Sequence, residues 1–390
     1  MSIAMPISAS ATSREFFAAN TRASWMLLAW IALLTLGVCM VASSTVAVAP
    51  GFLQRHLFSL LLAMIAFGCC LFIPLEWSSR FHRFAFPAAV LVCLLVFIPG
   101  MSEATKGAQR WIRIAGFSIQ PSELVKPLVV LYIAGYMERF GHLLGDRTFI
   151  LLKPVLLVGL VCALLIIQPD FGGAIVLATA VWGVLFVGGA RLRHFLLLIG
   201  VCGALGTVLV LTQAERIRRV TTFLDPWKDA YGDGYQLSQA LIAFGRGEIT
   251  GLGLGESVQK LFYLPEAHND FIVAVIAEEL GVVGVFGLMF LFVVLVTGIW
   301  TRAREHLRHE RRFIGYLCYG IGLLFALQFM VNVGVCTGVL PTKGLTLPFV
   351  SYGGNSLIVC CAMFGLVLRG DIEAAAEPPR RVRTRKTHRG

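Results

Sequence analysis

The sequence has few charged residues for its length. Only 14% of its 390 residues are Asp, Glu, Lys or Arg, whereas 57% are hydrophobic and the mean hydropathy is +0.79. A soluble domain carries about 25% charged residues, and a globule of this length could not enclose so many apolar side chains. The scarcity of charge therefore excludes a soluble protein and predicts an all-α protein that lies in a lipid bilayer.

Several common functional motifs are also missing. The ten cysteines form no CxxC pair and lie almost wholly in apolar runs, so neither a zinc site nor a disulfide framework is indicated. The run GLGLG at 251–255 is not followed by GK[ST], which favours flexible turns over a nucleotide-binding loop. The net charge of +11 is explained by basic loops kept on one side of a membrane. We therefore expect no nucleic-acid partner.

Ten apolar segments are candidates for membrane-spanning helices, each of which needs about 20 apolar residues. They predict a leader over 1–24, one membrane domain over 25–369 and a basic tail over 370–390. The predicted spans are 25–47, 57–75, 86–100, 122–138, 150–168, 172–190, 194–212, 271–300, 313–336 and 348–369.

The distribution of Lys and Arg predicts the orientation of these spans. Ten crossings put both termini on the same side, where 21 basic residues lie, against 12 on the other side. Six of the 12 belong to the loop 213–270, which is discounted because long loops cross largely regardless of charge. The sequence thus predicts cytoplasmic termini and a large extracytoplasmic loop over 213–270. The basic tail is interpreted as a solvated retention signal, or as a contact for acidic membrane lipids.

The segment 218–281 is the richest in polar residues. Near its start, Arg219 could hold phosphate oxygens. Pro265 favours the first turn of a helix, which would place Glu266 and Asp270 four residues apart on one face. Asp270 then marks the start of a span, where it is either a functional acid or an acid that stabilises the helix end. Below it, a small and polar stripe consists of Ala274, Ala277, Glu278 and Gly281.

Three further polar patches fall at the outer ends of predicted spans. They are 106–127, QPDFGGA at 168–174 with Asp170, and 340–356, where Lys343 stands almost alone among apolar residues. Together the four patches predict a cavity open to the outer face with charges of both signs. In the first of them, helix capping and an ion pair compete with ligand binding as roles for the polar groups. Its candidates are Arg110, Trp111, Gln120, Glu123 and Lys126.

The motifs in these patches resemble those of the SEDS family of ten-span bacterial membrane proteins. GAQRWI, QPSE, QPDFG, YLPEAHxDF, EELG and LPxKGLTLPFxSYGG occur in the family's order within 25–369. DPWKD (225–229) and AFGRGE (243–248) are similar to the cell-division branch, and the rod-elongation branch is the nearest alternative. One residue departs from the family: Asn269 stands where Thr is usual, and it keeps a side chain that forms hydrogen bonds.

The resemblance implies a peptidoglycan glycosyltransferase that polymerises lipid II at the division septum, on the outer face of the bacterial inner membrane. A class B penicillin-binding protein and other division proteins are the implied partners. Lipid II would lose undecaprenyl diphosphate in an inverting displacement, which needs a base and positive charge at the leaving group. Asp270 is the implied base, and Glu266 would raise its pKa by like-charge repulsion. The implied substrate-binding residues are Arg110, Trp111, Gln120, Glu123, Lys126, Asp170, Arg219, Lys260, His268, Lys343 and Ser351.

The resemblance also implies residues that bind the diphosphates, and a metal ion. The candidates for binding the diphosphates are the cationic side chains of that set. A divalent cation, Mg²⁺ or Mn²⁺, is implied for the family, but no His/Cys cluster in this sequence suggests its ligands. The cationic candidates are Arg110, Lys126, Arg219, Lys260 and Lys343.

Two other functions are compatible with the sequence. A lipid II flippase would need polar groups along a path through the whole membrane. The polar residues instead cluster in the outer half, with Glu278 and Glu279 as the main exceptions. A non-catalytic scaffold that recruits the septal transpeptidase would leave Asp270 with a purely structural role.

Overall fold

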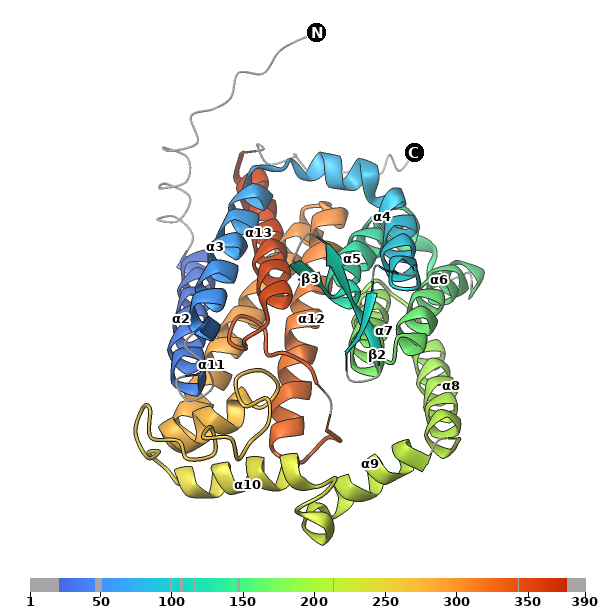
Figure 1. The fold of residues 1–390 in the computed structure, drawn as a ribbon. Coiled ribbons are helices and arrows are strands. Elements are labelled where there is room, and N and C mark those ends of the chain that lie inside the picture. The colour runs from blue at the N-terminus through green and yellow to red at the C-terminus, as the bar shows by residue number, and fades with distance from the viewer. Residues whose placement is uncertain are drawn as a thin grey trace, which may run out of the picture.

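The computed structural model describes residues 21–45, 51–98, 100, 102–105, 108–114, 117–145, 148–212, 214–342 and 344–376 (Figure 1). Most of the predicted leader and most of the basic tail lie outside these residues. Ten of the described helices are 17 to 37 residues long, and each overlaps one predicted span. These are α2 (Thr21–Thr45), α3 (Gly51–Phe72), α4 (Leu75–Leu95), α5 (Pro121–Phe140), α6 (Thr148–Ile167), α7 (Phe171–Val187), α8 (Leu192–Leu211), α11 (Ile272–Arg308), α12 (Arg312–Cys336) and α13 (Gly354–Ala376).

The helices confirm the predicted class, a helical protein that crosses the membrane several times. Among the described residues, five helices are long and apolar enough to cross a membrane by length and composition alone. Exposed large apolar side chains on several helices suit contact with lipid, as at Phe149 and Phe290, which are 79% and 66% exposed. The five apolar spans are Ser24–Thr45, Gly51–Phe72, Phe149–Ile167, Ile272–Arg308 and Arg312–Cys336.

Several predicted helix borders are wrong by several residues, and two of these differences have a clear cause. α4 begins at Leu75, after an extended Pro74, whereas the predicted span begins at 86. The first ten residues of α4 are helical, but they are too polar to be recognised as part of an apolar span. α13 begins at Gly354 instead of 348, because Phe349 has a positive φ of 67° and the chain turns there. Helical residues other than Gly rarely adopt positive φ.

A small antiparallel sheet between α4 and α5 was not predicted. Its strands are β1 (Ser102–Thr105), β2 (Ala108–Ile114) and β3 (Phe117–Ile119), in the order β1-β2-β3. In the register of this sheet, Ile112 of β2 pairs with Ile119 of β3. The apolar and aromatic residues of AQRWIRI suit a strand. The prediction for this patch rested on its polar residues, so the strand was not predicted.

The long loop before α11 is largely folded. It contains the helix α9 (Ala214–Leu224), the short 3-10 helix η2 (Pro226–Asp229) and the helix α10 (Tyr235–Gly247). α9 and α10 lie at the lower end of the bundle in Figure 1, opposite the end at which α13 finishes.

The core consists of two neighbouring clusters of buried apolar side chains. One joins α2, α3, α11, α12 and α13, and there Trp30 stacks on Phe67 at 4.6 Å between ring centroids. The other joins α4, α5, α6 and α7. Tyr316 and Leu323 of α12 pack against both clusters. α12 therefore lies at the boundary between the two halves, and its far end meets the candidate site.

Candidate functional site

The segment 340–356, which joins α12 to α13, is held against the residues just before α11. The backbone N–H of Tyr352 donates to the carbonyl of His268 at 2.9 Å. The hydroxyl of Ser351 donates to the carbonyl of Asn269 at 2.6 Å. These two bonds place the SYGG and AHND motifs side by side, although about 80 residues separate them in the chain.

The same segment also meets the other two polar patches. Asn355 Nδ2 donates to the carbonyl of Ser118, in the first patch, at 2.6 Å. Gly172 of QPDFGGA packs on Leu345, because a Cβ added to Gly172 would lie 3.1 Å from Leu345 Cγ. The structure therefore brings the four predicted polar patches together around 340–356.

The backbone of Asp270 is fixed by a buried amide of α12. Asn332 is 1% exposed, and its Nδ2 donates to the carbonyls of Asp270 at 3.1 Å and of Leu345 at 2.6 Å. One side chain thus ties the end of the long loop to 340–356. Asn332 is not among the residues predicted from the sequence, although a polar residue inside an apolar span is a signal for function.

The carboxylate of Asp270 lies against the backbone beside Lys343. A Cβ added to Gly344 would lie 2.7 Å from Asp270 Oδ2. Glycine therefore leaves room for the carboxylate at this point. Lys343 itself lies outside the described residues, and its role at the diphosphate stays a prediction.

Residues 265–271 form turns, and the predicted helix from Pro265 is wrong. Glu266 has a positive φ of 57°, and its carbonyl accepts the N–H groups of Asn269 at 3.0 Å and Phe271 at 3.4 Å. A residue with that φ does not continue a right-handed helix. Glu266 and Asp270 consequently do not lie four residues apart on a helical face, and an effect of Glu266 on the pKa of Asp270 stays a prediction.

His268 belongs to an aromatic cluster at the same place. Its ring makes edge contacts with Phe52 and Tyr352, at 5.1 and 5.4 Å between centroids. Burial lowers the pKa of His268, and the nearby charge of Glu266 partly opposes this effect. His268 is therefore a neutral ring at neutral pH. Its role toward substrate stays a prediction.

The first patch contains a buried ion pair. Lys126 Nζ lies 2.7 Å from Glu123 Oε1, and these side chains are 2% and 6% exposed. The ion pair, one of the roles that the sequence left open for the polar groups of this patch, is therefore present. Next to it, Gln120 Nε2 donates to Asp170 Oδ2 at 3.5 Å, and the other oxygen of Asp170 accepts the N–H of Gly173 at the start of α7. Asp170 therefore caps that helix.

Lys260 and Ser351, two more of the predicted substrate-binding residues, also have partners within the protein. The ammonium of Lys260 donates to three oxygens, those of Glu279, Ser43 and the Gly255 carbonyl, at 2.6 to 2.8 Å. An ammonium has three donors, so none is left for a diphosphate, and this prediction is wrong in the present conformation. Ser351 is 3% exposed and likewise binds main-chain groups through its hydroxyl. It positions 340–356 instead of facing a substrate.

Three further predicted contacts fall at the edge of what the structure describes. β2 contains Arg110 and α9 contains Arg219, but their side chains lie outside the described part. Trp111 of β2 is half-buried. Within the described residues, no group of three or more His, Cys, Asp or Glu side chains could hold a metal ion. No ligands for a divalent cation can therefore be assigned among these residues.

Comparisons with known proteins show the family to which this chain belongs. The family described as "Cell cycle protein", which covers FtsW, RodA and SpoVE, matches residues 23–375. The probable peptidoglycan glycosyltransferase FtsW of Coxiella burnetii is 42% identical over 354 residues, covering 89% of this chain and 95% of that protein. The protein of the same name from Marinobacter nauticus is 44% identical over 350 residues, covering 88% of each.

Solved structures show the same fold. A chain from the study "Structural coordination of polymerization and crosslinking by a peptidoglycan synthase complex" has a TM-score of 0.73 at 28% identity, covering 90% of this chain and 98% of that chain. RodA of Thermus thermophilus has a TM-score of 0.66 at 28% identity, covering 89% and 95%. The family match and the FtsW relatives together show that this chain belongs to the FtsW/RodA/SpoVE family, the SEDS proteins, and is FtsW-like.

Proposed function

We propose that this chain is a peptidoglycan glycosyltransferase that polymerises lipid II during cell division. The observation that carries the proposal is the position of Asp270, whose carboxylate lies against Gly344 where the four polar patches meet. The FtsW relatives are named for this activity, which supports it. The rod-elongation role is the alternative within the family.

The proposed chemistry is one displacement with inversion. The 4-hydroxyl of one GlcNAc attacks C1 of the donor MurNAc, the bond from C1 to the diphosphate oxygen breaks, and Asp270 accepts the proton of the hydroxyl. Cationic groups stabilise the charge on the departing undecaprenyl diphosphate. Arg110, Arg219 and Lys343 are the proposed groups, since Lys126 and Lys260 are paired with buried carboxylates.

The paired state of two deep carboxylates favours this enzyme over a flippase. Glu278 and Glu279 are 0% exposed, and both have protein partners, including Arg246 at 3.4 Å and Lys260 at 2.7 Å. These acids therefore do not line an open polar path through the membrane.

We further propose the setting of the reaction. Both termini lie in the cytoplasm, and α9 and α10 lie outside it, as the distribution of basic residues indicates. The protein acts at the septum with a class B penicillin-binding protein, which cross-links the strands, and with other division proteins. The likeness to a chain of a complex that coordinates polymerization and crosslinking supports such a partner.

The test is polymerisation of labelled lipid II by purified protein with a class B partner. Asp270→Asn should abolish measurable product, because general-base catalysis contributes about 10²- to 10⁴-fold. Asp233→Asn is the matched control. Asp233 is exposed and pairs with Arg218 on the loop, so this change should leave the rate unaltered.

Three results would count against the proposal. Near-normal turnover by Asp270→Asn would remove Asp270 from the mechanism. Transport of lipid II across proteoliposomes without any glycan product would indicate a flippase. Cells that divide normally on the Asp270→Asn variant would indicate a scaffold.

A further inference from the structure

α11 consists of two helical segments that meet at Gly281. Gly281 has φ 66° and ψ −167°, which is not helical, and a Cβ there would lie 2.4 Å from Gly251 N and Ile249 O. No residue with a side chain fits this backbone. The segment 272–280 is thus not a rigid continuation of 282–308, and its direction must be set by other contacts.

The loop after α10 fills the break with main-chain hydrogen bonds. The N–H groups of Leu252 and Gly253 donate to the carbonyls of Glu278 and Glu279, each at 3.0 Å. On the other side of the break, Val282 N–H donates to the carbonyl of Glu248 at 3.0 Å. Residues 248–253 therefore replace the helical bonds that are lost at Gly281.

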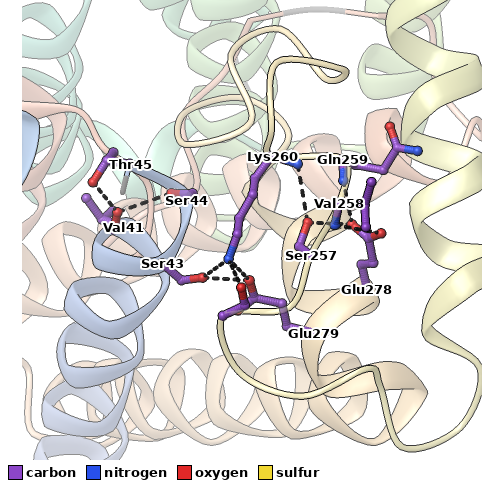
Figure 2. A network of polar contacts seen from close by, with 11 residues as sticks. Val41, Ser43, Ser44, Thr45, Ser257, Val258, Gln259, Lys260, Glu278 and Glu279 are labelled. Carbon is purple, nitrogen blue, oxygen red and sulfur yellow. Dashed lines mark hydrogen bonds and ion pairs between the residues drawn. The ribbon is translucent and has the colours of Figure 1, made fainter. Parts of the chain in front are cut away.

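Side chains then anchor this end of the segment to α2. Glu279 accepts hydrogen bonds from Lys260 at 2.7 Å and from Ser43 at 2.6 Å, and Lys260 also donates to Ser43 at 2.8 Å (Figure 2). Glu279 is 0% exposed and Lys260 is 6% exposed. Three segments far apart in the sequence meet in this triad: the end of α2, the loop and the first part of α11.

The neighbouring Glu278 holds the loop from the other face. Its carboxylate accepts the N–H groups of Val258 and Gln259 at 3.2 Å each, together with the Ser257 hydroxyl (Figure 2). Arg246 of α10 pairs with it at 3.4 Å. Both glutamates are thus used to fix the break.

We propose that Glu279 is a positioning residue for Asp270. The two are nine residues apart, and the helical segment between them rises about 1.5 Å per residue, so Glu279 does not touch the reacting groups. It acts by holding the far end of 272–280 against Lys260 and Ser43, while Asn332 holds the near end. This role rests on the proposed function, in which Asp270 is the base.

The experiment compares Glu279→Gln with the double variant Lys260→Met/Glu279→Gln. The single change leaves the Lys260 ammonium buried without its counter-charge, so the loop and 272–280 should shift. We expect kcat to fall by about 10- to 100-fold with KM for lipid II unchanged, because a misplacement of about 1 Å can cost about 10²-fold. The acid limb of the pH profile of kcat should also move, because a shift of 272–280 changes the surroundings of the Asp270 carboxylate. The double variant should recover part of kcat, because no charge remains unpaired.

Glu310→Gln serves as the matched control. Glu310 pairs with Arg312 on an exposed turn, where the Glu310 side chain is 70% exposed, so the change should alter neither kcat nor the pH profile. A second readout does not depend on turnover. The rate at which a carbodiimide modifies Asp270, read by mass spectrometry, should differ from wild type in Glu279→Gln and not in Glu310→Gln.

The outcomes separate the two proposals. A wild-type protein that forms no glycan strands contradicts the proposed function, while the modification rate of Asp270 still decides the positioning role. An unchanged kcat, acid limb and modification rate in Glu279→Gln would overturn that role. The positioning role would also be overturned if kcat fell only in proportion to the loss of folded protein while the acid limb stayed in place. That pattern would mean that Glu279 and Lys260 form a purely structural pair.

Discussion

Three uncharged residues next to Asp270 help to place it. The amide of Asn332 holds its carbonyl, the hydroxyl of Ser351 holds that of Asn269, and Gly344 leaves space for its carboxylate. Because each of these groups is buried or lacks a side chain, a small change in any of them moves the carboxylate. At the scale of single residues, the site therefore depends on space and hydrogen bonding as much as on charge.

Gly344→Ala should slow polymerisation without preventing folding. The new Cβ would lie 2.7 Å from Asp270 Oδ2, so the carboxylate must move aside. We expect kcat to fall by up to about 10²-fold, measured as single-turnover strand synthesis with the class B partner. Gly159→Ala on α6 is the control, because nothing lies within 4 Å of its added Cβ. Equal rates in both variants would show that the carboxylate of Asp270 tolerates displacement.

The neutral state of His268 should make stability depend on pH. Burial lowers its pKa in the folded protein, so the unfolded chain binds the proton more readily. Stability is then fully present above about pH 6.5, the ordinary value for histidine, and is lost as the pH falls through it. The melting temperature in detergent should drop from pH 7.5 to pH 5.5. The drop should be smaller for His268→Phe, which keeps the ring contacts with Phe52 and Tyr352. An equal drop in both proteins would assign it to other groups.

At the scale of elements, the break in α11 is the feature that orders the site. The glycines of 245–255 favoured flexible turns when considered as sequence. In the structure they let α10 and its following loop approach α11 closely, since a Cβ on Gly247 would lie 1.8 Å from the carbonyl of Ala277. The predicted stripe from Ala274 to Gly281 is buried along this contact.

Gly281→Ala should destabilise the protein, whereas Gly287→Ala on the same helix should not. Alanine at 281 must adopt a positive φ, which costs on the order of 1–3 kcal/mol, and must also displace the backbone of 249–251. Nothing lies within 4 Å of a Cβ added to Gly287, where alanine should be neutral or gain up to about 1 kcal/mol. Melting temperatures and yields of monodisperse protein would check this. A stable Gly281→Ala variant would mean that α11 can close into one continuous helix.

At the scale of the whole molecule, the two ends of the bundle carry different polar structures. One end has α9, α10 and the site around Asp270. At the other end, buried Asp371 of α13 accepts from Arg302 at 2.8 Å and contacts His306 at 2.9 Å, both on α11. These contacts tie the ends of α11 and α13 together. The orientation of the bundle in the membrane therefore decides which of the two polar ends faces the cell wall.

Cysteine labelling in intact cells should show that α9 and α10 face outward. Tyr231→Cys, at a position 95% exposed in the loop, should react with a membrane-impermeant maleimide. Glu310→Cys, between α11 and α12, should react only after the membrane is permeabilised. The chain without added cysteine is labelled in parallel, since Cys39 and Cys69 are exposed. Reaction of the Glu310→Cys variant with the maleimide in intact cells would contradict the proposed topology.

The class of the fold and the approximate positions of ten long helices follow from the amino-acid sequence alone. Long apolar runs report membrane helices because each helix satisfies its own main-chain hydrogen bonds, so no distant contact is needed to identify it. The convergence of the four polar patches was also expected, since all of them fall at the same ends of the predicted spans.

The roles of individual polar residues depend on contacts that form only in the folded protein. Lys260 was expected to bind a diphosphate, yet its burial and its contact with Glu279 at 2.7 Å make it part of an internal ion pair. The turn at Glu266 replaced the expected helix because the chain there bends to meet 340–356, a contact between segments about 80 residues apart. Local sequence patterns carry no information on such partners, because the pairing energy arises only when the folded chain brings both groups out of water.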